Sequence, residues 1–292
     1  MSSFWSLWII VLTVITLVGV TWLLFANRKS KLNADNEAKT GHVYDGIEEY
    51  DNPLPAWWFN LFVLTIIFSV GYLILYPGMG NFKGILGWTS LGQWEAEVKA
   101  ADEKFGPMYA KLAQQPIAEL VHDKKAMKIG QRLFANNCAT CHGSDAGGNL
   151  GYPNLTDNDW LYGGSPDQIL TSITNGRNAV MPAWANTLGS EGLENVSSYV
   201  FNLSAGNADS TGEGGKTFAT MCSVCHGADA KGNIALGAPN LTDDVWLYGG
   251  SKDHILQTLA SGRNGKMPAH KDLLSSEKIH ILAAYVFSLS NE

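Results

Sequence analysis

The stretch CATCHG, Cys138–Gly143, returns in slightly altered form as CSVCHG at Cys222–Gly227. Each copy places two thiols and an imidazole within five residues. All four cysteines of the 292-residue chain lie in these two motifs, so none is left for a disulfide elsewhere. The spacing must therefore be explained by the chemistry of the motif itself.

The segments that follow the two motifs also repeat. YPNLTDNDWLYGGSPDQIL (Tyr152–Leu170) matches APNLTDDVWLYGGSKDHIL (Ala238–Leu256) at an offset of 86, and NGRNAVMPAW (Asn175–Trp184) matches SGRNGKMPAH (Ser261–His270). The cysteine motifs are offset by 84, so the second copy has two extra residues just after its motif. Two copies are too few for a solenoid and are typical of tandem domains.

Helical spacing of apolar residues opens and closes each copy, and a short helix is predicted between them. No long run shows strand alternation, so the fold class is predicted to be all-α, with domains at 124–204 and 205–292. The Gly- and Ser-rich segment Ala205–Gly215 is expected to join them. Domains this small have little core of their own, and a large bound group would supply one.

Two long runs without charge precede the repeats. The first is Phe4–Ala26, within residues 1–26, and the second covers residues 56–76. Each is long enough to cross a hydrocarbon core of about 30 Å, and aromatic residues lie near the ends as in interfacial belts. A cleaved signal peptide is the alternative for the first run. The run exceeds the usual apolar length of such peptides, however, and no basic segment precedes it.

Basic residues predict which side of the membrane each part occupies. Arg28, Lys29 and Lys31 follow the first span, and no Lys or Arg precedes it. The positive-inside rule then places the loop 27–55 in the cytoplasm. Both termini, a linker at 77–123 with a helical segment, and both repeats would lie in the periplasm, with the spans in a bacterial inner membrane.

The C-x-x-C-H pattern is typical of covalent attachment of c-type haem, in which the thiols form thioethers and the histidine binds the iron. Thioredoxin-like chemistry would need a strand–turn–helix setting that is not visible, and a zinc site would need four ligands from nearby pairs. Two motifs in register make chance remote. Two covalently bound haem c groups are therefore predicted, held by Cys138, Cys141 and His142 and by Cys222, Cys225 and His226.

One methionine in each repeat is the candidate sixth iron ligand. Met181 and Met267 lie 39 and 41 residues after the motif histidines, in matched RN-x-x-MPA contexts. His/Met ligation fills the coordination sphere and favours electron transfer over ligand binding. Filling a gap in the core is the alternative role for each methionine. Three histidines of the second repeat are rival iron ligands: His254, His270 and His280. Their counterparts in the first repeat are Gln168, Trp184 and Glu194, which could not play the same part.

Together these features resemble the dihaem subunit III of cbb(3)-type, C-family haem–copper cytochrome c oxidases. The most specific signature is DGIEEYDNPLPAWW, Asp45–Trp58, leading into a span, and the tandem CxxCH…GRNxxMP repeats complete it. The resemblance implies two transmembrane helices followed by two tandem class I cytochrome c domains. The extra first span departs from simpler members, which have one.

Further site residues are expected around the haems. By resemblance to monohaem cytochromes c, the backbone carbonyls of Pro153 and Pro239 would accept the second N–H of the ligating histidines. Six side chains are candidates for binding the haem propionates: Arg177, Arg263, Trp160, Trp246, Tyr162 and Tyr248. For the aromatic residues the alternative is that WLYGG builds a turn and part of the core.

The resemblance also implies a role in respiration. Subunit III accepts electrons from a soluble or membrane-bound cytochrome c and passes them to the monohaem subunit. They then reach the catalytic haem–copper subunit, which reduces oxygen to water. The chain itself would be an electron-transfer subunit without catalytic residues. The alternatives are a free-standing membrane-anchored dihaem cytochrome that serves other periplasmic reductases, and a dihaem peroxidase, which the two methionines disfavour.

The net charge of the chain limits the kinds of partner that it can bind. The chain carries −7, which makes nucleic acid an unsuitable ligand. From Lys83 onward it has 16 basic and 21 acidic side chains. An electron donor with a basic docking face is therefore expected.

Overall fold

The computed structural model describes residues 1–28, 39–50 and 54–290, and the chain forms two compact units, Met1–Glu103 and Lys104–Glu292. Two of the basic residues that predict the membrane orientation, Lys29 and Lys31, lie outside the described residues.

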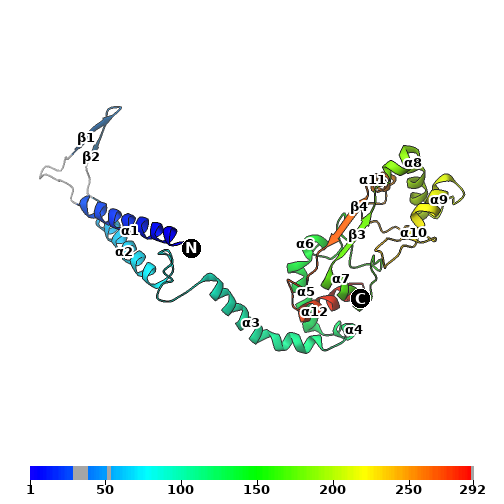
Figure 1. The fold of residues 1–292 in the computed structure, drawn as a ribbon, viewed down its shortest axis with the longest axis horizontal. Coiled ribbons are helices and arrows are strands. Elements are labelled where there is room, and N and C mark those ends of the chain that lie inside the picture. Colours follow the sequence, from blue (N-terminus) through cyan, green and yellow to red (C-terminus); the bar gives the residue numbers. More distant parts are fainter. Residues whose placement is uncertain (29–38, 51–53, 291–292) are drawn as a thin grey trace. The chain divides into compact units, whose positions relative to one another are not determined.

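Two long helices form most of the first unit (Figure 1). They are α1 (Ser3–Ala26) and α2 (Ala56–Leu75), and both are long and apolar enough to cross a membrane. This confirms the two helices predicted from the apolar runs. The backbone N–H of Asn81 donates to Ser6 Oγ over 2.9 Å, so the start of α1 is tied to the segment that follows α2.

A β-hairpin lies between the two long helices in sequence. It consists of β1 (Lys39–Tyr44) and β2 (Ile47–Tyr50), which pair antiparallel. Asp45 and Gly46 form its turn with positive φ, the conformation that an Asp-Gly pair favours between strands. The all-α prediction is therefore wrong here, because it gave no weight to this two-residue turn signal.

After α2 the chain folds back on the end of that helix. The N–H groups of Ile85 and Leu86 donate to the carbonyls of Ile74 and Leu75, each over 3.0 Å. The ring of Trp88 then meets that of Tyr76 edge-on at 6.0 Å. Helix α3 (Ser90–Ala113) follows directly.

The second unit contains the two sequence repeats. The first comprises α5 (Lys124–Asn137), α6 (Ala139–His142), α7 (Pro166–Asn175), β3 (Arg177–Met181) and α8 (Ala185–Ser204), preceded by the short α4 (Ile117–Leu120). The second comprises α9 (Glu213–Thr217), the π-helix η1 (Phe218–Cys222), α10 (Ser223–His226), α11 (Lys252–Ser261), β4 (Arg263–Met267) and α12 (Ser276–Leu289).

Matched caps start the corresponding helices. Ser165 caps α7 and Ser251 caps α11, each accepting from the backbone N–H three residues on. At α7 this is a complete capping box with Gln168, and Pro166 occupies the first turn, where its missing N–H costs nothing. The predicted short helices are confirmed. The predicted joint ends earlier than expected, because Gly214 and Gly215 already belong to α9.

The two repeats exchange their last helices. The core around α5 and α7 contains Phe134 and Ile173 together with Ile281 and Leu282 of α12, from the other repeat. The second core joins Val196 of α8 to residues of η1 and α11. Figure 1 shows α12 lying beside α5 and α7. Each core is thus built from both repeats, so the packing crosses the boundary at 204 and 205.

A glycine marks each exchanged helix crossing. A Cβ on Gly130 of α5 would come within 2.4 Å of the Tyr285 Cβ on α12, and one on Gly214 of α9 would come within 2.9 Å of the Tyr199 Cβ on α8. Only glycine allows the helices to approach this closely. The same contact therefore occurs twice, each time between an opening helix and the closing helix of the other repeat.

A short antiparallel sheet joins the repeats. Strands β3 and β4 pair over their full length, with Arg177 opposite Met267 and Met181 opposite Arg263. This sheet is a second departure from the all-α prediction. Five-residue strands whose partner lies about 86 residues away give no local periodic signal, and only their tertiary pairing makes them strands.

Candidate haem-binding sites

Each C-x-x-C-H motif lies on a short helical turn after a longer helix. In the first repeat, Cys138 links α5 to α6 and His142 ends α6, with Gly143 following at φ 81°. In the second repeat Cys222 ends the π-helix η1 instead, and His226 ends α10, with Gly227 following at φ 80°. No disulfide joins any of the four cysteines. The turn places both thiols and the imidazole of one motif within a single helical turn.

Burial acts on the first thiol of each motif. It raises the pKa of Cys138 to about 11, with a smaller contribution from the neighbouring Cys141, and burial raises the pKa of Cys222 in the same way. Both side chains are partly buried, whereas Cys141 and Cys225 are exposed. The Cys138 and Cys222 thiols are therefore neutral at physiological pH and lie at the edge of an apolar core, which suits attachment of an apolar group.

Backbone carbonyls fix the ring orientation of both motif histidines. His142 Nδ1 lies 3.0 Å from the Pro153 carbonyl oxygen, and His226 Nδ1 lies 3.1 Å from that of Pro239. A carbonyl oxygen only accepts, so Nδ1 carries the proton in each ring and Nε2 keeps its lone pair. Burial also lowers the pKa of His226. The neutral ring with a free Nε2 is the form that binds a metal ion.

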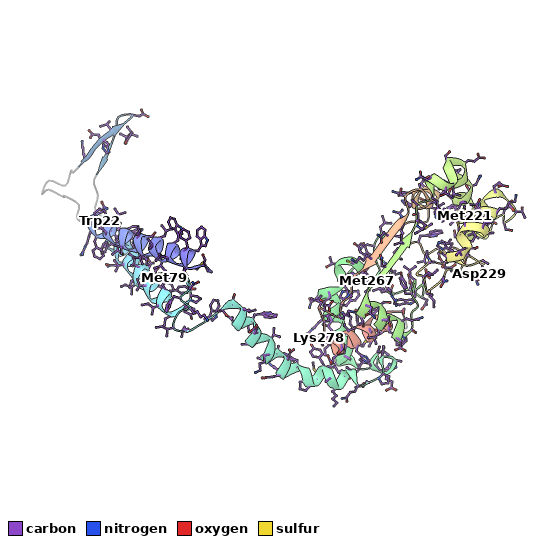
Figure 2. The ribbon with its side chains drawn as sticks, viewed as in Figure 1. Trp22, Met79, Met221, Asp229, Met267 and Lys278 are labelled. Atoms are coloured by element: carbon purple, nitrogen blue, oxygen red, sulfur yellow. The ribbon has the colours of Figure 1, made fainter. Side chains whose placement is uncertain are left out.

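The methionines cross between the repeats. Met267 packs against the core that includes Cys138 and Trp160, although it belongs to the second repeat. Met181 of the first repeat packs against the core that includes Cys222 and Trp246. Figure 2 shows Met267 at the β3–β4 pair, where it ends strand β4. The sequence pattern suggests pairing within each repeat, whereas the structure packs each methionine against the same core as the first motif cysteine of the other repeat.

Arginine and tyrosine form a matched pair in each repeat. The Arg177 guanidinium lies 4.6 Å from the centre of the Tyr162 ring, and that of Arg263 lies 4.5 Å from the Tyr248 ring. Arg177 also donates to Ser172 Oγ, and Arg263 donates to Thr258. These contacts hold each guanidinium group in place and leave some of its N–H donors for another acceptor.

The WLYGG segments build turns in both repeats. A Cβ on Gly164 would come within 2.5 Å of the Trp160 ring, and one on Gly250 within 2.4 Å of the Trp246 ring. Each tryptophan therefore folds over the second glycine of its own turn, and both tryptophans pack against the cores. Both tryptophans thus belong to a turn and to a core, and propionate binding by Trp160 and Trp246 stays a prediction.

Two buried polar atoms lack a hydrogen-bond partner among the described residues: the Tyr162 hydroxyl and His270 Nδ1. An unpaired buried polar group costs about 1–3 kcal/mol, so such atoms mark places where a further group is expected. Tyr162 also has its pKa raised by burial. An acceptor such as a haem propionate would satisfy its hydroxyl, so the surroundings of Tyr162 fit a haem group.

The rival histidines have other surroundings. His280 Nε2 lies 2.8 Å from the Gln115 carbonyl oxygen, and His254 lies over Gly249, where a Cβ would come within 2.2 Å of His254 Nδ1. His270 is buried, and its backbone N–H donates to the Ile173 carbonyl. Met127 packs against the first core, whereas Met221 is 37% exposed.

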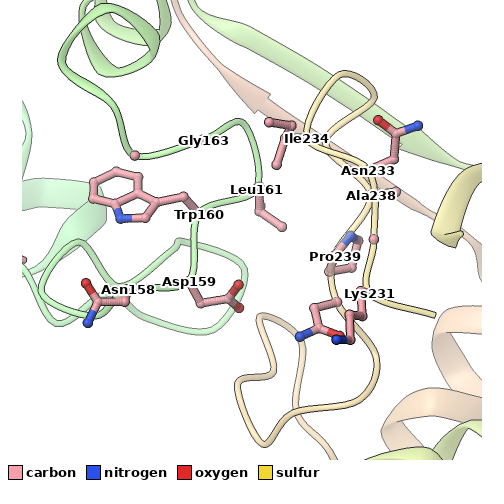
Figure 3. Close-up of a pocket in the computed structure, with 13 residues that line it drawn as sticks. Asn158, Asp159, Trp160, Leu161, Gly163, Lys231, Asn233, Ile234, Ala238 and Pro239 are labelled. Atoms are coloured by element: carbon pink, nitrogen blue, oxygen red, sulfur yellow. The ribbon is translucent and has the colours of Figure 1, made fainter. Parts of the chain in front are cut away.

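A cavity of about 550 Å³ lies between loops of the two repeats (Figure 3). Trp160 and Asp159 line it from the first repeat, and Lys231 and Pro239 line it from the second. Trp160 belongs to the surroundings of the first motif, and the Pro239 carbonyl faces the second motif histidine. The two candidate haem sites therefore approach each other across this cavity.

Sequence reasoning missed the exchange and a carboxylate cluster. Because both repeats carry the same motifs, the sequence pattern is the same whether a methionine and a closing helix pack in their own repeat or in the other one. Near the cavity, burial raises the pKa of Asp157 and Asp159, and the Asp243 carboxylate of the other repeat raises them further. The repeated NLTD segments hold this signal, but only the fold brings them together.

Comparison with known proteins gives matches over nearly the whole chain. Residues 36–83 match the N-terminal domain of cytochrome oxidase-cbb3, FixP. Residues 125–200 and 209–286 match the cytochrome c oxidase, cbb3-type, subunit III model. The chain belongs to this family. The matched segments include both C-x-x-C-H motifs.

Curated relatives agree with the family models. The cbb3-type cytochrome c oxidase subunit CcoP of Rubrivivax gelatinosus is 47% identical over 99% of this chain and 96% of its own length. Subunit FixP of Azorhizobium caulinodans is 39% identical over 88% of this chain and 94% of its own length. Subunit CcoP of Cereibacter sphaeroides is 37% identical over 86% and 93%, respectively. As a member of this family, the chain is a c-type cytochrome subunit of a cbb3-type oxidase.

Proposed function

We propose that the chain holds two covalent haem c groups and relays electrons into the oxidase. Cys138, Cys141 and His142 attach one haem, and Met267 supplies its sixth ligand. Cys222, Cys225 and His226 attach the other, and Met181 supplies its sixth ligand. When bound, each haem provides a one-electron redox centre whose potential a methionine ligand raises.

A single observation carries this proposal. Each motif histidine has a free Nε2, and one methionine packs against the same core as the first cysteine of that motif. A filled coordination sphere leaves no place for oxygen or peroxide, so these residues suit electron transfer rather than catalysis. The guanidinium groups of Arg177 and Arg263 would bind the propionates, and stacking on Tyr162 and Tyr248 positions those arginines. Pro153 and Pro239 hold the histidine tautomer.

The assignment of partners rests on family membership. The electrons come from a soluble or membrane-bound cytochrome c and pass to the monohaem subunit and then to the catalytic haem–copper subunit. The chain spans the inner membrane twice, with its haem-binding part in the periplasm and the short loop at 27–55 in the cytoplasm. The chain has no catalytic role by itself.

Purification from native membranes tests the proposal. Denatured chain stripped with acidic acetone should keep two haem c groups, measured as the pyridine haemochrome per chain. The reduced intact haems of this chain should not bind carbon monoxide. Carbon monoxide binding would indicate an open iron and a peroxidase-like role. Isolation without any other oxidase subunit would favour the free-standing dihaem cytochrome.

A further inference from the structure

Helix α3 carries an apolar seam on its first half. Leu91, Trp94 and Val98 are 61%, 60% and 39% exposed, and Phe105 is 44% exposed. The seam continues through Ala101 to Met108 and Leu112 with spacings that alternate between three and four residues. This is the pattern of a coiled-coil seam, in which a and d positions face a partner helix.

Nothing in the described part of the first unit covers the first half of this helix. Every residue from Ser90 to Phe105 is exposed, whereas Met108 and Leu112 further along pack against a buried core. Most helices in proteins gain their stability by packing an apolar face. The exposed part of the seam therefore requires a partner.

The charges beside the seam select the kind of partner. Glu95 and Asp102 flank it on one side, and Glu97 and Lys104 flank it on the other, so three of these four charges are acidic. Lys99 and Glu103 pair with each other away from the seam at 3.9 Å. An acidic border is repelled by anionic lipid headgroups, to which basic helices bind. A second copy of the same helix would place like charges opposite each other. A helix with basic flanking residues satisfies both the seam and its border.

The position of the seam favours a membrane-protein partner. Trp88 contacts Tyr76 just after the end of α2, and the backbone of Ile85 and Leu86 is bonded to the last turn of that helix. Leu91, the first seam residue, follows Trp88 by three residues. The seam thus begins where the second apolar helix ends, at the level where helices of a neighbouring membrane subunit would emerge.

We propose that residues 91–105 of α3 dock on a helix of another subunit of the same oxidase, one with apolar a and d positions and basic flanking residues. This docking surface rests on family membership and does not depend on the electron-transfer role. It would hold the chain next to its partner beyond the contacts made by α1 and α2.

Site-specific photocrosslinking in native membranes tests the proposal. A benzophenone amino acid replaces Trp94 on the seam or, as the matched control, Ala100 on the opposite side of the helix. We expect Trp94 to give an adduct with another oxidase subunit at several times the yield of Ala100. Adducts with lipid or with a second copy, equal yields at the two positions, or no adduct would each overturn the proposal.

Charge insertion gives an independent test. Trp94→Glu places a charge in the seam, and Ala100→Glu adds the same charge on the other side of the helix. After detergent solubilisation, Trp94→Glu should lower the ratio of this chain to the rest of the complex severalfold, and Ala100→Glu should leave it unchanged. The haem c content per chain reports folding. Equal ratios in the two variants, at equal haem content, would contradict the proposal.

Discussion

Arg177 and Met267 lie directly opposite each other in the β3–β4 ladder, although 90 residues separate them in the sequence. The pairing brings a methionine of the second repeat to an arginine that stacks on Tyr162 in the first. Met181 and Arg263 repeat the arrangement in reverse. The two candidate haem sites are therefore interlocked, and a change in one repeat is expected to act on the site of the other.

Truncation of Ile281 should show this directly. Ile281 of α12 is fully buried in the core around α5 and α7. Ile281→Ala should lower the free energy of unfolding by about 2–5 kcal/mol, the usual cost of such a cavity. Ile281→Ala should also change the absorption spectrum of the haem attached to Cys138 and Cys141, which variants that keep only one haem can show. A change confined to the haem of its own repeat would contradict the exchanged core.

A glycine in the second repeat tests the contact with Tyr162. Gly237 has φ +70°, and a Cβ there would come within 2.2 Å of Tyr162 Cζ. Gly206 has a nearly equal φ of 71° but has nothing within 4 Å of its Cβ position. Gly237→Ala should therefore destabilise the protein more than Gly206→Ala, by about 1–3 kcal/mol of overpacking. Similar melting temperatures for the two variants would rule out the close packing of Tyr162.

The carboxylate cluster predicts a pH-dependent effect. Burial and the Asp243 and Asp157 charges raise the pKa of Asp159 above its ordinary value. Ionisation is therefore less favourable in the folded chain, and stability is lost as pH rises through the ordinary carboxyl range near 4. Asp159→Asn should raise the melting temperature at neutral pH and have no such effect near pH 3. The exposed Asp272→Asn serves as the control for loss of one charge.

Ionic strength tests the docking of the donor. The chain from Lys83 onward has five more acidic than basic side chains. Long-range attraction should speed the encounter with a basic cytochrome c, and salt screens it. The second-order rate constant of reduction in stopped-flow experiments should fall as the salt concentration rises. A rate constant that does not change with salt would show that this charge has no part in docking.

Much of the site could be predicted from the sequence because its chemistry is local. Cys138, Cys141 and His142 lie on one helical turn, and the carbonyl that orients the ring is only 11 residues away. The helix that completes each core could not be predicted in this way. Two repeats with the same apolar pattern offer two closing helices that fit either core, and long-range packing decides between them.

The β-hairpin and the β3–β4 sheet were missed for different reasons. Asp45 and Gly46 give a local turn signal, but the strands that they join, Lys39–Tyr44 and Ile47–Tyr50, are too short to show a clear alternation. Strands β3 and β4 have no local signal, because each is a strand only through the other. The unpaired Tyr162 hydroxyl likewise depends on burial by the fold, which residue types alone do not reveal.

Crossed methionine ligation is the central claim, and single-haem proteins test it most directly. The Cys138→Ala/Cys141→Ala protein keeps only the haem at Cys222 and Cys225, and the second variant in this background is either Met181→Ala or Met267→Ala. Met181→Ala should abolish the absorption band of methionine–iron coordination and lower the reduction potential, and Met267→Ala should leave both unchanged. Loss of the band with Met267→Ala and its survival with Met181→Ala would contradict the account.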